Sequence, residues 1–160
     1  YKMLCVFASR QIRNLATLGG NLSNASPIGD MPPVLMAYDA SVVLENTSGK
    51  RQLKLTEFIT GYRTTLLQPS EIISGIIIPK PDHKRRTESY KISKRKDMDI
   101  STVSAGFSLL LNTDNTVKDI RMYYGGMAAM TKEPLKAKNY FSGKPWERKT
   151  VEEAMKLIDQ

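Results

Sequence analysis

The chain has 160 residues, 41% of them hydrophobic and 25% charged, a composition that is typical of one globular domain or two small ones and excludes a disordered tail. It contains neither an apolar run long enough to span a membrane nor the apolar core and cleavage site of a signal peptide, so we expect a cytoplasmic protein without membrane contact. Five of the eight net positive charges lie in residues 80–98, where eight basic residues accompany three acidic ones, so the charge marks one local segment.

The first predicted element is a helix over residues 3–15. The residues at helical spacing in it are Leu4, Phe7, Ala8, Gln11, Ile12 and Leu15. Cys5 is the only cysteine, which excludes an intrachain disulfide, and we expect it to be a small buried residue on this helix. Because the chain begins within this pattern at Tyr1, we expect it to be a fragment that holds only part of a site.

Two turn-rich segments are predicted after this helix. Residues 17–21 contain paired glycines, which permit positive φ angles and close backbone approach. Residues 24–30 end at Asp30, which we expect to cap a short helix that reaches about Ala37.

The next elements are predicted to be short strands and one short helix. Residues 41–45 and 51–55 should form a hairpin with a five-residue loop. Thr56 should then cap a helix reaching Tyr62. The β-branched run 71–79, closed by a proline, is typical of a mostly buried strand.

The second half of the chain predicts an antiparallel meander followed by two helices. The three predicted strands are 89–94, 102–111 and 117–124. Alternate residues of the second strand are apolar, so one of its faces should be buried. The helices are predicted over about 131–141 and from Thr150, where Thr150 and Glu153 fit a capping box. The elements together indicate an α+β fold with a boundary near residues 79–86.

The residues themselves offer little for acid–base, nucleophilic or metal chemistry. His83 is the only histidine, and it lies in the basic, proline-containing segment, where we expect it to be exposed. No HExxH, CxxC or calcium-loop motif occurs. We therefore expect no catalytic side chain and no metal site within this chain.

Residues 16–30 have the composition of a loop that wraps a polar ligand. They concentrate three glycines, two asparagines, several hydroxyls and Asp30. Glycine N–H groups can donate, Asn21 can both donate and accept, and Asp30 can accept from sugar hydroxyls. The composition alone favours the alternative, an ordinary pair of turns in which Asp30 serves only as a helix cap.

Several blocks of the sequence resemble a known family and occur in its order. The blocks are Phe7 to Asn21, Ala25 to Asp30, Gly61 to Leu66, the strand around Ile73, Tyr90 to Arg95 with Asp99 and Ile100, and Tyr124 to Met127. They resemble the second half of the flavin-binding domain of the molybdenum hydroxylases. Within that family they are most similar to the xanthine dehydrogenase type, in its bacterial form, where the flavin domain lies in a small subunit. The resemblance implies that residues 1–80 form the C-terminal portion of a PCMH-type FAD-binding domain. Residues 87–160 would form a CO dehydrogenase flavoprotein-like C-terminal domain, a small antiparallel three-stranded sheet with helices.

The resemblance also implies a function and a set of cofactor contacts. FAD would pass electrons from 2Fe-2S clusters to NAD⁺ in an oligomeric enzyme whose iron–sulfur domain and molybdopterin-binding subunit or domain lie outside this chain. The positions that match FAD contacts of the family are Phe7, Thr17, Leu18, Gly19, Gly20, Asn21, Asp30, Ile73 and Lys91. The family's upstream glycine-rich loop is absent before Tyr1, so FAD binding by this chain alone is expected to be weak.

Three other functions remain open at this point. The flavin module of a related aldehyde, carbon monoxide or hydroxybenzoyl-coenzyme A oxidising enzyme would look the same. A nucleic-acid or interaction domain could use the basic residues from Lys80 to Lys96, although only Tyr90 supplies an interleaved aromatic ring. Residues 87–160 could instead be a packing platform for subunits, with the flavin loops inactive.

Overall fold

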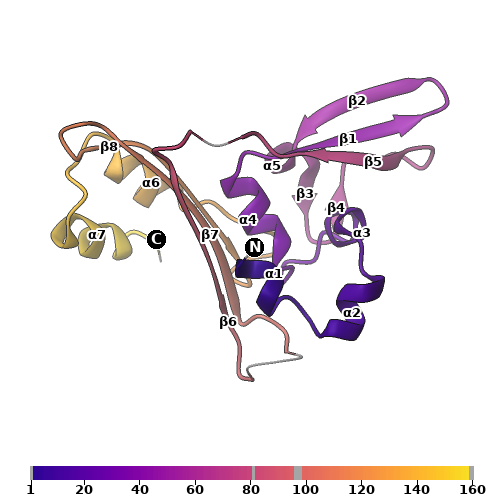
Figure 1. Cartoon of the computed structure of the whole chain (residues 1–160), viewed down its shortest axis with the longest axis horizontal. Coiled ribbons are helices and arrows are strands. Elements are labelled where there is room, and N and C mark those ends of the chain that lie inside the picture. Colours follow the sequence, from indigo (N-terminus) through magenta and orange to yellow (C-terminus); the bar gives the residue numbers. More distant parts are fainter. Residues whose placement is uncertain (1, 81, 96–98, 159–160) are drawn as a thin grey trace.

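The computed structural model describes residues 2–80, 82–95 and 99–158. Its elements in chain order are α1 (Lys2–Val6), α2 (Arg10–Leu15), α3 (Leu18–Ser23), α4 (Met31–Ala37), β1 (Ser41–Asn46), β2 (Gly49–Lys54), α5 (Leu55–Phe58), β3 (Ile59–Gly61), β4 (Thr64–Thr65), β5 (Ile72–Ile77), β6 (Arg86–Ile92), β7 (Val103–Leu111), β8 (Val117–Gly125), α6 (Leu135–Phe141) and α7 (Arg148–Met155). They form three small antiparallel sheets with short helices between and around them (Figure 1). The predicted α+β fold is confirmed.

The first sheet has the strand order β2-β1-β5. Asn46 pairs with Gly49, so the β1–β2 loop has two residues and the prediction of a five-residue loop is wrong. The Asn46 side-chain oxygen accepts from the N–H groups of Ser48, at 2.8 Å, and Gly49, at 3.1 Å, which closes the tight turn. Gly49 has a φ of 150°, a backbone angle that favours glycine.

Among the described residues, strand β5 pairs only with β1, so it is an edge strand. Ile72 is 65% exposed and Ile77 45% exposed, so the expected mostly buried strand is wrong. The apolar run gives the strand its β-propensity, but only one of its faces meets the core, through Ile73 and Ile76. The part of the chain that the structure describes leaves the other face of β5 largely uncovered.

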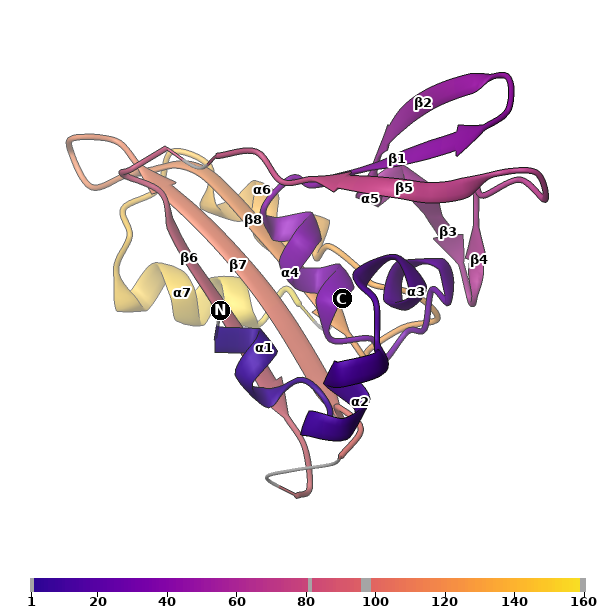
Figure 2. The ribbon, with the colours of Figure 1, turned by 45° about the vertical axis from the view of Figure 1, so that its right-hand side comes forward.

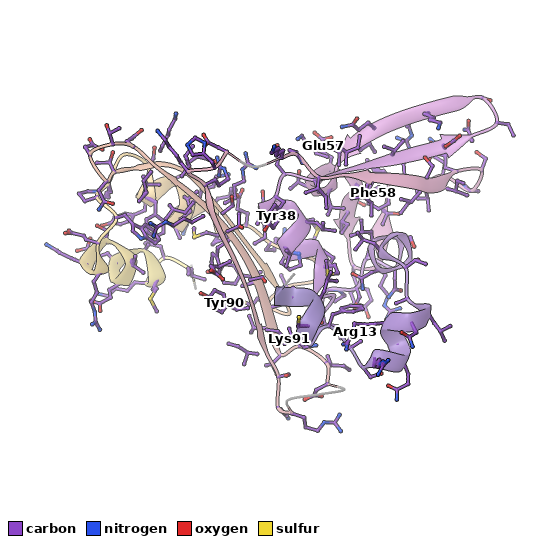
Figure 3. The ribbon with its side chains drawn as sticks, in the orientation of Figure 1. Arg13, Tyr38, Glu57, Phe58, Tyr90 and Lys91 are labelled. Carbon is purple, nitrogen blue, oxygen red and sulfur yellow. The ribbon has the colours of Figure 1, made fainter. Side chains whose placement is uncertain are left out.

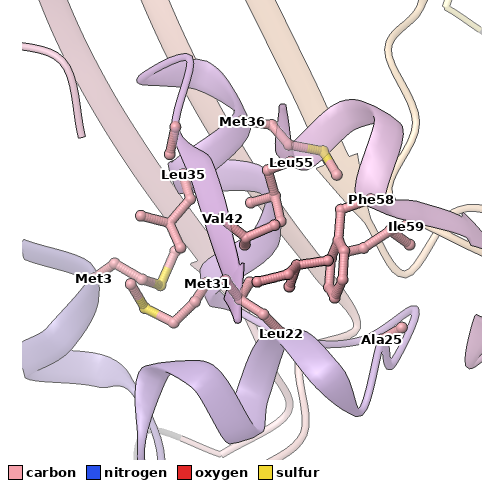
Figure 4. Packing of buried hydrophobic residues seen from close by; sticks show 12 residues of the cluster. Met3, Leu22, Ala25, Met31, Leu35, Met36, Val42, Leu55, Phe58 and Ile59 are labelled. Atoms are coloured by element: carbon pink, nitrogen blue, oxygen red, sulfur yellow. The ribbon is translucent and has the colours of Figure 1, made fainter. Parts of the chain in front are cut away.

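The predicted helix from Thr56 to Tyr62 is also wrong. Helix α5 is a single turn that follows Lys54, without a side-chain cap, and the chain continues as β3. The turn is stabilised by burial, because Leu55 and Phe58 are almost fully enclosed. They belong to a core that joins α1, α3, α4, β1 and α5 (Figure 4).

The third sheet, β6-β7-β8, confirms the predicted meander. Helices α6 and α7 lie on one of its faces and α4 on the other (Figures 1 and 2). Phe107, Leu109 and Leu111 pack toward α6 and α7, as the alternation predicts. The opposite face is buried as well, because small residues let α4 approach: a Cβ on Gly106 would lie 2.3 Å from the Pro33 carbonyl oxygen.

The two C-terminal helices begin at different residues from those predicted. Helix α6 starts after Pro134, four residues after the predicted start. Helix α7 follows Glu147, so Thr150 lies inside the helix, buried, and the predicted capping box is wrong. Glu153 accepts a hydrogen bond from the Tyr140 hydroxyl and so connects the two helices.

Candidate functional site

The N-terminal segment is two short helices with a sharp turn between them, so the single helix predicted over 3–15 is wrong. Ala8 has a φ of 45°, which no continuous helix accommodates. The Ser9 hydroxyl accepts from the N–H of Ile12 at 3.3 Å and caps α2. The Arg13 guanidinium donates to the carbonyl oxygens of Phe7, at 2.5 Å, and Ala8, at 2.7 Å. These contacts fix the turn that carries Phe7.

Cys5 does not occupy the buried position expected for it. It lies on α1 and is exposed, because the core contact of this short helix is made by Met3. The helix therefore presents its cysteine to solvent and its methionine to α4.

The segment 17–21 is the start of helix α3 and not the predicted glycine turn. Thr17 caps it, and its hydroxyl accepts from the Gly20 N–H at 3.0 Å. Neither glycine has a positive φ. A Cβ on Gly20 would lie 2.9 Å from the Thr17 hydroxyl oxygen and would crowd the cap, whereas a Cβ on Gly19 would make ordinary contacts at 3.7 Å to Ile73. Helix α3 packs against β5 at Ile73.

A cavity of about 770 Å³ opens between α1, α2, α3, α4 and β6. Four of the predicted contact residues line it: Phe7, Thr17, Leu18 and Asn21. Its volume is within the range of about 300–1,000 Å³ that is typical of small-molecule sites. The side-chain oxygen of Asn21 is buried and has no hydrogen-bond partner in the described ranges. An unpaired buried amide oxygen is costly, and a bound group with a donor would satisfy it.

Asp30 and Lys91 meet in a buried ion pair. The Lys91 ammonium lies 2.9 Å from Asp30 Oδ2, and the two side chains are only 8% and 7% exposed. Asp30 itself has helical backbone angles and makes no capping hydrogen bond, so its predicted role as a side-chain cap for α4 is wrong. Its second oxygen, Oδ1, accepts from the buried Ser101 hydroxyl instead.

The ion pair lies beside the cavity. Met31, the residue after Asp30, lines the cavity, as do Thr87 and Ser89 on β6. Alternate residues of a strand share a face, so Lys91 projects from the same face of β6 as Thr87 and Ser89. Tyr90 projects from the opposite face, where its ring packs at 5.9 Å from that of Phe107 (Figure 3).

Two cations of the basic segment, Arg85 and Lys91, are engaged by the protein itself. Arg85 lies 2.6 Å from Asp119 and donates to the Ser108 hydroxyl at 3.1 Å, and Lys91 is the buried partner of Asp30. The His83 side chain is 87% exposed, as expected, and its Nδ1 lies 3.3 Å from Asp82 Oδ1. Part of the predicted run, Lys96 to Met98, lies outside the described residues. The two most buried of the described cations of the run are paired inside the protein and not presented to a nucleic acid, which weakens that alternative.

The site suits a large, partly polar cofactor better than a reaction of its own side chains. Its walls combine an aromatic ring at Phe7 with the hydroxyl of Thr17 and the amide of Asn21, and a buried ammonium adjoins them. These groups fit FAD, whose ring system is apolar and whose chain carries hydroxyls and phosphates. Within the described part of the chain, no group of three or more His, Cys, Asp or Glu side chains is placed to hold a metal ion, and no helix could cross a membrane.

Sequence reasoning missed several residues around this cavity. Arg13, Thr87 and Ser89 line it, and Ser101 contacts Asp30. The alternation of Thr87, Ser89 and Lys91 on one strand is a signal that could have found the first two β6 residues. Ser101 lies 71 residues from Asp30, and no local pattern connects them.

Comparison with known proteins assigns both halves of the chain. A family model described as the FAD binding domain in molybdopterin dehydrogenase matches residues 2–81, and one described as the CO dehydrogenase flavoprotein C-terminal domain matches residues 88–160. The chain is 38% identical to a xanthine dehydrogenase of Emericella nidulans and 37% identical to a xanthine dehydrogenase/oxidase of Gallus gallus, over 99% and 95% of its length. It spans only 12% and 11% of these two relatives.

Solved structures agree with this assignment. The fold matches carbon monoxide dehydrogenase from Hydrogenophaga pseudoflava with a TM-score of 0.88 and 25% identity, over 95% of this chain and 52% of that chain. Quinoline 2-oxidoreductase from Pseudomonas putida 86 matches with a TM-score of 0.86 and 25% identity, over 99% of this chain and 54% of that chain. The predicted resemblance is confirmed: the chain belongs to the family of FAD-binding domains found in molybdopterin dehydrogenases.

Proposed function

We propose that this chain forms part of the FAD site of a xanthine dehydrogenase-like enzyme. The observation that carries the proposal is the cavity in which Phe7, Thr17, Leu18 and Asn21 meet, with the buried Asn21 oxygen left without a partner. The family model supports FAD as the ligand of residues 2–81. FAD supplies the redox chemistry when bound, accepting electrons that come from iron–sulfur clusters and passing them on to NAD⁺.

The side chains of this chain bind and orient and do not react. Phe7 and Leu18 offer apolar surface for a ring system, and the Asn21 oxygen accepts a hydrogen bond. Gly19 and Gly20 carry no side chains, so the α3 backbone beside Leu18 and Asn21 can come close to the cofactor. Lys91 brings a positive charge beside the cavity, and Asp30 holds that charge in place.

The wider enzyme is part of the same proposal. Residues 1–80 would be the C-terminal portion of the FAD-binding domain, and residues 87–160 the second domain. An iron–sulfur domain, a molybdenum-binding subunit or domain and NAD would be the partners, in an oligomeric cytoplasmic protein. The much greater length of the curated relatives supports further domains.

A second candidate is the flavin module of a related oxidising enzyme. The structural match to carbon monoxide dehydrogenase favours it. The higher identity to xanthine dehydrogenases, 38% against 25%, favours the first candidate. Reduction of the intact enzyme by a purine or by carbon monoxide distinguishes the two.

The test is the flavin content and FAD affinity of the intact protein that contains this chain. We expect bound FAD, and we expect Asn21→Ala to weaken FAD binding about 5-fold to 10-fold, because a buried hydrogen bond contributes about 1 kcal/mol or slightly more. Asn24→Ala is the matched control, since Asn24 ends the same helix but is exposed. A folded intact protein that binds no FAD would contradict the proposal.

A further inference from the structure

The loop before helix α4 is held by the distant third sheet. The Pro27 carbonyl accepts from the Gly126 N–H at 2.7 Å, and the Gly29 carbonyl lies 3.4 Å from the Ser104 hydroxyl. Asp30 closes the same loop, with Lys91 at one carboxylate oxygen and Ser101 at the other. Residues near the end of β6, at and just before the start of β7, and just after β8 therefore hold this loop and the Asp30 carboxylate.

The Asp30 carboxylate is fixed by two donors of different kinds. The Lys91 ammonium carries the charge that compensates it in a buried place, where an unpaired carboxylate would be strongly unfavourable. Ser101 is 2% exposed, and its hydroxyl carries no charge, so its contribution is a hydrogen bond that orients the carboxylate. Without it, Oδ1 would be a buried oxygen that competes for the same ammonium.

The Lys91 ammonium has capacity left for a ligand. It has three N–H donors, and across the described ranges only Asp30 accepts from one of them. The side chain is 8% exposed, so water has little access to the remaining donors. The strand face that carries Lys91 also lines the cavity, through Thr87 and Ser89.

We propose that Ser101 is a positioning residue of the flavin site. Its hydroxyl donates to Asp30 Oδ1, so that only one of the three Lys91 N–H groups donates to the carboxylate. The other two N–H groups are then directed at acceptor atoms of the cofactor. This inference rests on the proposed function. It adds Ser101 to the residues of the second half of the chain, Thr87, Ser89 and Lys91, that lie at or beside the cavity.

The experiment measures the FAD dissociation constant of the intact protein by flavin fluorescence, for wild type and variants. We expect Ser101→Ala to weaken binding about 10-fold, which is about 1.4 kcal/mol, because a hydrogen bond to a charged carboxylate is lost. Ser101→Thr keeps the hydroxyl and should bind like wild type. Ser108→Ala is the matched control, a buried serine of β7 whose hydroxyl contacts Arg85 and not Asp30.

A double-mutant cycle separates positioning from general stability. In a Lys91→Met background Ser101→Ala should cause little further loss of FAD affinity, because its effect passes through the ammonium. An equal loss in both backgrounds, or wild-type affinity for Ser101→Ala, would overturn the inference while leaving FAD binding intact. If Ser101→Ala does not fold, Ser101→Cys replaces it, since a thiol is a weaker donor of similar size. If the intact wild-type protein binds no FAD, the proposed function and this inference are both rejected.

Discussion

Helices α2 and α4 are almost equally short, yet none of the six residues of α2 is buried and six of the seven residues of α4 are. Both carry apolar side chains, among them Ile12 and Leu15 in α2 and Leu35 and Met36 in α4. Ile12 is 55% exposed and Leu15 88% exposed, whereas Leu35 and Met36 are each 3% exposed. The local sequence shows which residues are apolar, but other parts of the chain decide which of them are covered.

The cover of α4 comes from strands that are far away in the sequence. The helix packs on β7 and β8, and its first turn approaches Gly106 so closely that no side chain fits there. Tyr38, at its C-terminal end, lies in hydrogen-bond distance of Thr87 on β6, with 2.8 Å between the hydroxyl oxygens. Helix α2 receives no such cover from the described residues, and it is held by its cap at Ser9 and by Arg13. Truncating an apolar side chain to alanine should therefore lower the free energy of unfolding more in the covered helix α4 than in the uncovered helix α2.

The largest expected difference is between Leu35→Ala and Ile12→Ala. Leu35→Ala removes buried methyl groups from the core of the first half and should lower the free energy of unfolding by about 2–5 kcal/mol. Ile12→Ala removes a similar side chain from the surface and should change it by less than about 0.5 kcal/mol. Urea unfolding of both variants measures this, and equal losses would remove the distinction between the helices.

The close contact between α4 and β7 is tested by Gly106→Ala. The new Cβ would lie 2.3 Å from the Pro33 carbonyl oxygen and 2.8 Å from the Val34 Cα, so the helix must shift. We expect a loss of about 1–3 kcal/mol in the free energy of unfolding, the usual cost of overpacking. Gly75→Ala is the matched control, because its Cβ would make only ordinary contacts at 3.9 Å to Val43. A Gly106→Ala variant as stable as the Gly75→Ala variant would mean that α4 does not press on β7.

The same division explains what the sequence could predict. The meander and the start of α4 follow from alternation, turns and paired prolines, which are local signals, and the structure has them. Thr150 and Glu153 fit the local pattern of a capping box, but Thr150 is buried inside α7, which begins at Arg148. The partial exposure of β5 depends on how many strands the sheet has, which its own residues do not encode.

The candidate site shows the same limit. Phe7, Thr17, Leu18 and Asn21 were predicted through a family resemblance, and the structure brings them to one cavity. The contact of Asp30 with Lys91 and Ser101 joins segments 61 and 71 residues apart, so it required the three-dimensional fold. Contacts of this range follow from packing between units and leave no periodic trace in the sequence.

A smaller, pH-dependent effect is expected at the uncovered edge strand β5. Glu71, just before this strand, accepts from Arg51 at 2.6 and 2.8 Å and from the Gln68 N–H at 2.9 Å. The hydrogen bond from Arg51, followed by that from Gln68, lowers the pKa of Glu71 to about 2. Because the pKa is lower in the folded state than in the unfolded state, the pair stabilises the fold above the unfolded pKa of about 4.3. This stabilisation is lost as the pH falls from there through about 2.

The measurement compares thermal unfolding of wild type and Glu71→Gln at several pH values. Wild type should be the more stable protein near pH 6, and the gap should close as the pH falls toward about 2, because the glutamine cannot titrate. Glu57→Gln, an exposed position on α5, is the control. A gap that stays constant with pH would mean that the ion pair does not form in solution.

The smallest expected change in stability is that of Leu15→Ser, at the end of α2. Leu15 is 88% exposed, so replacing it with a polar residue removes no packing contact and should alter the free energy of unfolding by less than about 0.5 kcal/mol. The same variant should bind less of a hydrophobic fluorescent dye, because it removes the most exposed of the large apolar side chains in the described residues. Arg10→Ser, on the same exposed helix, is the control for the loss of a long side chain. A large loss of stability for Leu15→Ser would show that α2 is covered in solution, and the contrast with α4 would then not hold.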